Sequence, residues 1–157
     1  EENVRFPLDF FSTMSLTEKN ARIAFCLDRV RIPQSALRKN TAELSGGMQK
    51  RVAIARAIAL NPKYLFCDEP NSGLDPETSV VIDQLIQELT REFGMTTVVN
   101  THDMNSVLEI GDHVVLLRHG YKVWEGSGPE ILKATDQEVV DYVFVSALFK
   151  RVRSALK

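Results

Sequence analysis

The sequence has few cysteines, no long apolar run and no excess of basic charge, and each shortage excludes a class of protein. Cys26 and Cys67 are its two cysteines. Their spacing fits no zinc or redox motif, so a disulfide framework is excluded and a reducing compartment is expected. No apolar run approaches the roughly 18–20 residues that a membrane span needs. The net charge of −2 gives no reason to expect a nucleic-acid partner.

One kind of glycine-rich loop is also missing. Glycine occurs eight times, but none of these residues begins the pattern G-x-x-x-x-G-K-[ST], and no glycine precedes a lysine. That pattern builds the loop that holds the phosphates of a nucleotide in many NTPases. The chain begins at Glu1 without Met and with apolar residues close behind. This beginning predicts a start inside a larger domain.

The remaining composition is that of a globular protein of 157 residues, 44% hydrophobic and 25% charged, which is enough for one domain with a core. The capping-box pattern at Ser15–Glu18 predicts a helix that ends near Val30. "SGGMQKRVAIARAIAL" predicts a second helix, from Ser45 to Asn61. "YLFCDE" and "MTTVVNT" predict buried strands, with a helix from Pro76 to Gly94 between them.

Beyond the second strand, residues 103–111 predict a short helix. Residues 113–126 predict a hairpin that turns at His119-Gly120, and the tail from Pro129 is predicted to be helical. The alternation of helices and strands predicts an α/β fold with a parallel sheet covered by helices. In such sheets ligands bind beyond the carboxyl ends of the strands.

The serine–glycine pattern Ser45-Gly46-Gly47 stands at a predicted helix start, where unpaired backbone N–H groups attract anions. Glycines allow a phosphate to approach the backbone closely, and a serine adds a hydroxyl donor. A plain serine-capped helix after a flexible turn explains the same residues when they are taken alone.

Acidic and histidine side chains follow the two predicted strands. Asp68 can hold Mg²⁺, and Glu69 can orient or deprotonate the water that attacks a γ-phosphate. Because neighbouring side chains on a strand point to opposite sides, both can serve one site only if the strand ends there. His102 can hydrogen-bond a phosphate oxygen. A solvated strand end and a bystander histidine are the alternatives for each residue on its own.

Order and spacing together are more specific than any of these signals. "LSGGMQKRVAIARAIALNPKYLFCDEPNSGLDP" followed by "NTHDMNSV" resembles the ATP-binding-cassette (ABC) ATPases. The fold that the resemblance implies is an α/β, P-loop NTPase-like parallel sheet with flanking helices, incomplete because the Walker A strand and loop are absent. Residues 1–44 would then be part of the helical subdomain, 45–128 the C-terminal part of the ATPase core, and 129–157 a C-terminal helical extension.

The resemblance also implies roles for particular residues. The catalytic residues would be Glu69 and the switch histidine His102, and Asp68 would be the metal ligand of the Walker B motif. The nucleotide-binding residues would come from the signature motif and the D-loop: Ser45, Gly46, Gly47, Gln49 and Asp75. Met48, where many members have Gln, and Asn71, where Thr or Ser is common, depart from the family pattern.

The resemblance further implies ATP and Mg²⁺ as cofactors and a head-to-tail dimer of ATPase subunits in which each signature motif covers the partner's ATP. Membrane-spanning permease subunits would be the other partners, at the cytoplasmic face of the membrane. The chain alone, without Walker A, is expected to be inactive. Its motifs look most like those of bacterial lipid-transporter ATPases linked to mammalian-cell-entry proteins. A soluble ABC-type ATPase of DNA repair or translation and a nucleotide-free interaction module are the alternatives.

Overall fold

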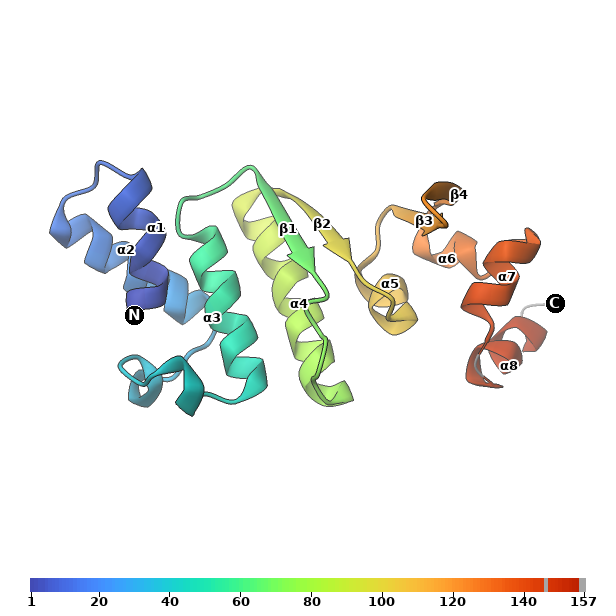
Figure 1. Cartoon of the computed structure of the whole chain (residues 1–157), viewed down its shortest axis with the longest axis horizontal. Helices are drawn as coiled ribbons and strands as arrows, with labels where there is room; N and C mark the ends of the chain where they lie inside the picture. The colour runs from blue at the N-terminus through green and yellow to red at the C-terminus, as the bar shows by residue number, and fades with distance from the viewer. Residues whose placement is uncertain (146, 156–157) are drawn as a thin grey trace. The chain divides into compact units, whose positions relative to one another are not determined.

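The computed structural model describes residues 1–145 and 147–155. By its internal contacts the chain divides into two compact units, residues 1–100 and residues 101–157. In the first unit the elements are α1 (Glu2–Phe11), α2 (Leu16–Arg29), the 3-10 turns η1 (Gln34–Ala36) and η2 (Thr41–Glu43), α3 (Gly46–Ile58), β1 (Tyr64–Asp68), α4 (Pro76–Phe93) and β2 (Thr96–Asn100) (Figure 1). In the second unit they are α5 (Met104–Ile110), β3 (Val114–Arg118), β4 (Tyr121–Gly126), α6 (Gly128–Ile131), α7 (Gln137–Val143) and α8 (Ala147–Ala155).

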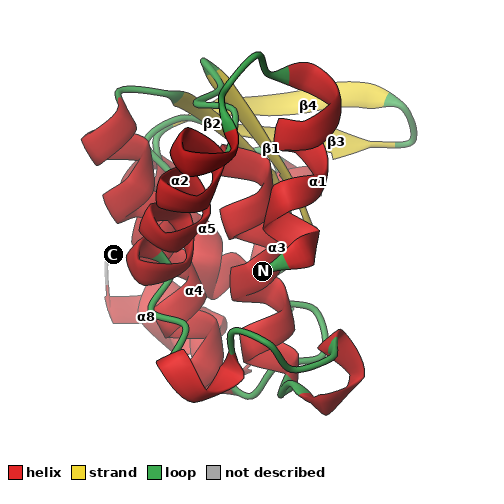
Figure 2. Ribbon diagram, turned by 90° about the vertical axis from the view of Figure 1, so that its left-hand side faces the viewer, coloured by secondary structure: helices red, strands yellow, loops and turns green. Residues whose placement is uncertain are grey.

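The sheet of the first unit consists of β1 and β2, which are parallel and are connected through α4. Tyr64 pairs with Thr96, and Asp68 pairs with Asn100, so the two strands end together. This arrangement confirms the predicted α/β class with parallel strands and flanking helices. Figure 2 shows the same elements coloured by type.

The core of the first unit lies among its helices and on one face of its sheet. Contacts join α3 to α1, α2 and α4, and α4 also contacts β2. The buried residues of α3 and α4 follow helical spacing: Val52, Ile54, Ala55, Ile58, Ile82, Leu85, Ile86 and Leu89. On the sheet, Leu65 is buried, whereas Phe66 and Val98, which pair with each other, are exposed. One face of this sheet therefore carries apolar side chains in contact with solvent.

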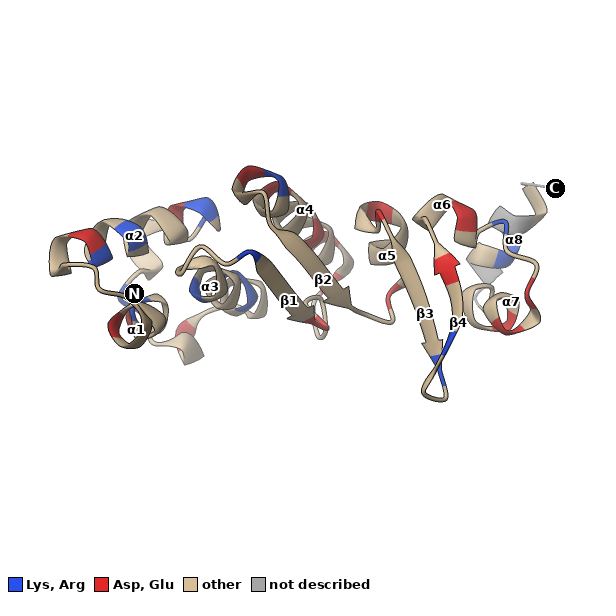
Figure 3. Cartoon of the chain, turned by 90° about the horizontal axis from the view of Figure 1, so that it is seen from above, with Lys and Arg blue, Asp and Glu red and all other residues tan. Residues whose placement is uncertain are grey.

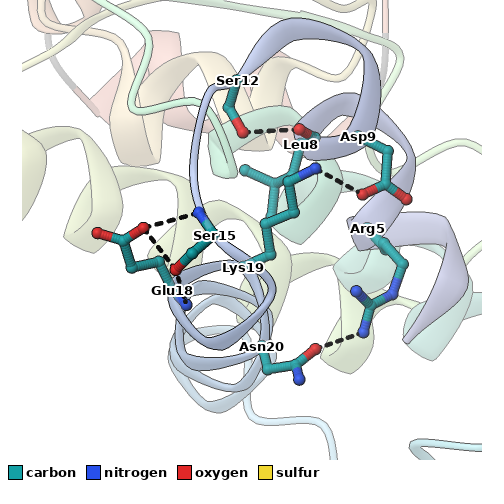
Figure 4. Close-up of polar contacts among 8 residues, drawn as sticks. All are labelled: Arg5, Leu8, Asp9, Ser12, Ser15, Glu18, Lys19 and Asn20. Carbon is teal, nitrogen blue, oxygen red and sulfur yellow. Dashed lines mark hydrogen bonds and ion pairs between the residues drawn. The ribbon is translucent and has the colours of Figure 1, made fainter.

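The helix boundaries follow the predicted caps. Ser15 and Glu18 form the capping box that starts α2 (Figure 4): the backbone N of Ser15 donates to the Glu18 carboxylate, and the backbone N of Glu18 donates to Ser15 Oγ. Asp75 caps α4, with Pro76 as its first residue. Gly94 ends α4 in the left-handed conformation, with φ of 59°.

No helix or strand was predicted for residues 1–14, but helix α1 lies there. Pro7 lies inside this helix, where it removes one backbone donor. Tertiary contacts compensate: Val4 and Leu8 are fully buried, and Lys19 of α2 forms a 2.9 Å ion pair with Asp9 (Figure 4). The opposite side of α1 is aromatic and exposed, at 49%, 70% and 73% for Phe6, Phe10 and Phe11.

The second unit contains the predicted hairpin. Strands β3 and β4 are antiparallel, and His119 and Gly120 have φ of 50° and 82° at the turn, as a two-residue turn of the I′ kind requires. Leu116, Ile131, Val139, Val143 and Phe144 form its core. The tail forms three short helices, because Asp136 caps a new helix at α7. Residues 146, 156 and 157 of the predicted extension lie outside the described residues.

Across the residues that the structure describes, no helix combines the length and the apolar character that crossing a bilayer requires.

Candidate functional site

The first component of the candidate site is the turn that starts α3, Ser45–Gly47, here named the signature turn. Ser45 is the N-cap of α3, and its Oγ accepts a 3.3 Å hydrogen bond from the backbone N of Met48. Ser45 and Gly46 are exposed, whereas Gly47 is buried. The turn therefore presents the N–H end of a helix to solvent on one side and packs against protein on the other.

The glycines of the signature turn contact α4 and the loop before it. A Cβ on Gly46 would lie 3.3 Å from Leu74 Cδ2, and one on Gly47 would lie 2.6 Å from Thr78 Cγ2. The second distance is shorter than real Cβ contacts allow. Gly47 is thus required by packing within the chain, whatever binds outside it.

Gln49 contacts the chain that precedes the signature turn. Its Nε2 donates to the backbone oxygens of Thr41 and Leu44, both at 3.1 Å. In this structure the side chain of Gln49 stabilises the η2 turn, and its predicted contact with a nucleotide stays a prediction.

The second component lies at the carboxyl end of β1. Asp68 is exposed and Glu69 is half-buried, and Figure 3 shows acidic residues just beyond the end of the β1 arrow. Asn100 at the end of β2 donates from Nδ2 to Asp68 Oδ1 at 2.7 Å. The parallel pairing thus places an amide beside the predicted metal ligand.

The backbone at Glu69 is held in an unusual conformation. Its φ is 47°, in the left-handed region that costs a non-glycine residue energy and often marks functional sites. Its N–H donates to Asn100 O at 2.9 Å. Its carbonyl oxygen accepts from Lys50 Nζ at 3.0 Å. Lys50 lies one turn along α3 from the signature turn, so α3 and the end of β1 are directly connected.

Asp75, the predicted D-loop residue, is the N-cap of α4. Its carboxylate accepts the backbone N of Thr78 at 2.9 Å and Thr78 Oγ1 at 2.6 Å. The hydroxyl and backbone bonds from Thr78 lower the pKa of Asp75 from its usual value. A contact with nucleotide stays a prediction for this residue as well.

His102 belongs to the second unit. It follows β2 by two residues, precedes Asp103, which caps α5, and is exposed. Its predicted role at a γ-phosphate stays a prediction.

Asn100 and Asp83 were not among the predicted site residues, although each forms a hydrogen bond next to the candidate site. Asp83 lies on α4, is 3% exposed, and accepts a 2.8 Å bond from Asn71 Nδ2. In the sequence, Asp83 stands among the apolar positions of a helix. A buried acid at such a position is stable only if it has a polar partner. Asn71 had been noted as a departure from the family pattern, but its partner was not identified.

The residues at the end of β1 fit a nucleotide-bound Mg²⁺. Within the described residues, no group of three or more His, Cys, Asp or Glu side chains could form a metal site of its own. Magnesium at nucleotide sites takes one or two protein carboxylates and completes its shell with phosphate oxygens and water. Asp68 meets this need, because Asn100 orients one of its oxygens.

Comparison with known proteins agrees with this geometry. The ABC transporter family model matches residues 1–72. The methionine import ATP-binding protein MetN of Caulobacter vibrioides is 46% identical over 130 residues, which are 83% of this chain and 39% of that protein. MetN of Streptococcus pneumoniae is 42% identical over 137 residues, which are 87% of this chain and 38% of that protein. The chain therefore spans less than half the length of these curated relatives.

Solved structures show the same fold. The ATP-binding cassette MJ0796, determined as a dimer in a post-hydrolysis state bound to ADP and Pi, superposes with a TM-score of 0.70 at 38% identity, over 80% of this chain and 55% of that one. CbiO1 from Clostridium perfringens, part of the ABC transporter complex cbiONQ, superposes with a TM-score of 0.77 at 31% identity, over 98% of this chain and 59% of that one.

The parallel strands, the capped turn of α3 and the acids at the end of β1 define a part of an α/β ATP-binding domain. Together with the matches to these relatives, this arrangement shows that the chain belongs to the ABC transporter family.

Proposed function

We propose that this chain is the C-terminal part of the ATP-binding subunit of an ABC transporter, and that the whole subunit hydrolyses ATP to drive transport. The observation that carries the proposal is the direct connection of the signature turn to the acidic end of β1. Lys50 bonds the carbonyl of Glu69, and the Gly47 turn packs on Thr78. The two segments that carry the proposed motifs are thus in direct contact within this chain.

In this proposal the chain contributes to two nucleotide sites of a head-to-tail dimer. Ser45, Gly46 and Gly47, together with Gln49 and Asp75, bind ATP held by a second, identical subunit. Asp68, Glu69 and His102 act on the nucleotide of their own subunit. In this proposal the phosphate loop belongs to a part of the subunit outside these 157 residues, which contain no G-x-x-x-x-G-K-[ST].

The reaction is attack of water on the γ-phosphorus of ATP, which breaks the bond to the oxygen bridging the β- and γ-phosphates and releases ADP and inorganic phosphate. Glu69 orients this water and accepts its proton, and its backbone bonds to Asn100 and Lys50 hold the residue in place. The exposed N–H groups of the signature turn bind the γ-phosphate of the ATP that the partner subunit holds. Asp68 would hold Mg²⁺, which supplies charge neutralisation at the phosphates when it is bound.

The partners in this proposal are a second ATPase subunit and membrane-spanning permease subunits, with the protein at the cytoplasmic face of the membrane. The exposed aromatic side of α1, formed by Phe6, Phe10 and Phe11, supports a protein contact in the part predicted as helical subdomain, residues 1–44. Residues 45–128 then form the ATPase core and 129–157 an extension.

The transported substrate is the finer part of the proposal. The motifs around residues 44–51, 68–76 and 101–107 suggested a lipid transporter, but the relatives reported above are named for methionine import and do not support that choice. They favour a small imported solute. Proteoliposomes of the complete transporter, assayed with labelled methionine and with labelled phospholipid, decide between the two: ATP-dependent methionine uptake without phospholipid transfer is expected.

The ATPase proposal is tested in the full-length protein by Glu69→Gln. The variant should bind Mg·ATP and form the dimer while its kcat falls by about 100-fold or more, because the base is lost. Turnover near the wild-type rate would remove Glu69 from its role. Calorimetry on the 157-residue chain with Mg·ATP should show no micromolar affinity. Such an affinity would contradict the proposal that the phosphate loop lies outside these residues. A full-length protein that hydrolyses ATP but never associates with membrane subunits would favour the soluble ATPase class.

A further inference from the structure

Helices α3 and α4 contact each other, and in Figure 1 they lie side by side. Gly47 is buried and meets the methyl group of Thr78, so that a Cβ there would lie 2.6 Å from Thr78 Cγ2. In an interior packed to crystal-like density, such a contact leaves no space for one more carbon atom.

The methyl group of Thr78 is held in place by the hydroxyl group on the same Cβ. Thr78 Oγ1 donates to Asp75 Oδ2 at 2.6 Å, and the backbone N of Thr78 donates to Asp75 Oδ1 at 2.9 Å. Because these bonds fix the hydroxyl, the side-chain torsion is fixed and the methyl group must point toward Gly47.

A second connection restrains the same two segments one turn further along α3. Lys50 Nζ donates to Glu69 O at 3.0 Å. Residues 45–50 are therefore joined to residues 69–78 at both ends, by a packing contact at Thr78 and by a hydrogen bond at Glu69.

We propose that Thr78 is a positioning residue: its methyl group, oriented by Asp75, sets the placement of the signature turn relative to the loop that carries Glu69. The nucleotide part of this inference rests on the function proposed above. In a dimer, the turn meets the partner's ATP while Glu69 acts on the ATP of its own subunit, so Thr78 couples the geometry of the two sites. Gly47 is then required by Thr78, and not only by a nearby phosphate.

The first test needs no nucleotide and uses thermal unfolding of the full-length protein. Alanine is a better helix former than glycine, so Gly47→Ala would raise Tm if there were no clash. We expect it to lower Tm by about 2–12 °C, from the usual cost of overpacking in a domain of this size. Thr78→Ser keeps the hydroxyl and removes the methyl group, and the double variant should recover the Tm of Thr78→Ser alone.

Gly46→Ala is the matched control, because its Cβ would meet only the end of the Leu74 side chain, at 3.3 Å. It should leave Tm unchanged or raise it. A Gly47→Ala protein with unchanged or raised Tm, or a double variant no more stable than Gly47→Ala, would overturn the packing relation.

The second test is kinetic and separates positioning from stability. Thr78→Ser loosens the signature turn without touching the base, so the KM for Mg·ATP should rise about three- to tenfold while kcat stays within about twofold, as for lost binding rather than lost chemistry. Thr17→Ser makes the same change at an exposed position of α2 and should alter neither constant. Unchanged KM in Thr78→Ser would show that Thr78 positions nothing for the nucleotide. A full-length protein without any ATPase activity would instead defeat the proposed function, and the Tm series would still decide the packing.

Discussion

Asn71 donates a 2.8 Å hydrogen bond from its Nδ2 to Oδ1 of Asp83, and the two residues are only 9% and 3% exposed. The bond ties the loop that follows Glu69 to the middle of α4. It links a residue of the predicted D-loop region to a carboxylate twelve positions further along the chain.

Replacing Asn71 with Leu should lower the free energy of unfolding by about 1.5–3 kcal/mol, since Asp83 keeps its burial and loses a hydrogen bond. Urea unfolding measures the change, with an unaltered m-value as the sign that the two-state comparison holds. Gln84→Ala, at the exposed neighbouring position of α4, should stay within about 0.5 kcal/mol of wild type. Equal stability of the Asn71 and Gln84 variants would contradict the importance of the buried pair.

Asn100→Asp tests the amide beside Asp68. The substitution replaces a donor at 2.7 Å by a second carboxylate, so the variant should lose about 0.5–2 kcal/mol at pH 7.5. The pKa of the introduced carboxyl is expected to be raised by its neighbour. A carboxyl whose pKa is raised in the folded state destabilises the fold once pH rises through that pKa. The Tm of the variant should therefore approach that of the wild type near pH 4.5. Thr96→Asp, opposite Tyr64 on the same strand pair, should show no such pH dependence.

Asp75 predicts a pH dependence of the opposite sign. Because the Thr78 bonds lower the pKa of Asp75 below its usual 3.8, the ionised cap stabilises the fold above that value. This contribution is lost as pH falls through the lowered pKa. Asp75→Asn can still cap the helix but carries no charge, so its Tm difference from wild type should shrink below pH 4. A constant difference from pH 7 to pH 2.5 would contradict the assignment.

The exposed aromatic side of α1 predicts a separation of binding from stability. The double variant Phe10→Ser with Phe11→Ser should keep the wild-type Tm, since both rings are at least 70% exposed, and should lose co-purification with the membrane subunits. Leu8→Ala, on the buried side of the same helix, should cost about 2–5 kcal/mol. If the double variant still assembles with its membrane partners, the surface is not the contact.

Local sequence signals were sufficient for much of the fold. Ser15, Pro76 and Gly94 marked helix ends because the cap or the backbone geometry that each one favours depends on residues within one helical turn. The hairpin turn at His119-Gly120 was likewise local. These features could be predicted because the physics that creates them involves neighbours in the chain.

Features that depend on distant residues could not be predicted in this way. Helix α1 contains Pro7 and forms because Val4 and Leu8 are buried against other helices. The bond between Asn71 and Asp83 requires α4 to turn Asp83 toward the protein interior. The packing of Gly47 against the Thr78 methyl group could not be predicted either, because it joins two helix ends that are 31 positions apart in the sequence.

The left-handed backbone at Glu69 has a consequence for adjacent acids on any strand. In a regular β-strand, the side chains of two successive residues point to opposite sides of the sheet, so two adjacent carboxylates cannot face the same site. With a φ of 47°, Glu69 leaves the pleat directly after Asp68, and the rule of alternation ceases to apply between the pair. A single left-handed residue thereby lets Asp68 and Glu69 serve the one nucleotide site that is proposed for them.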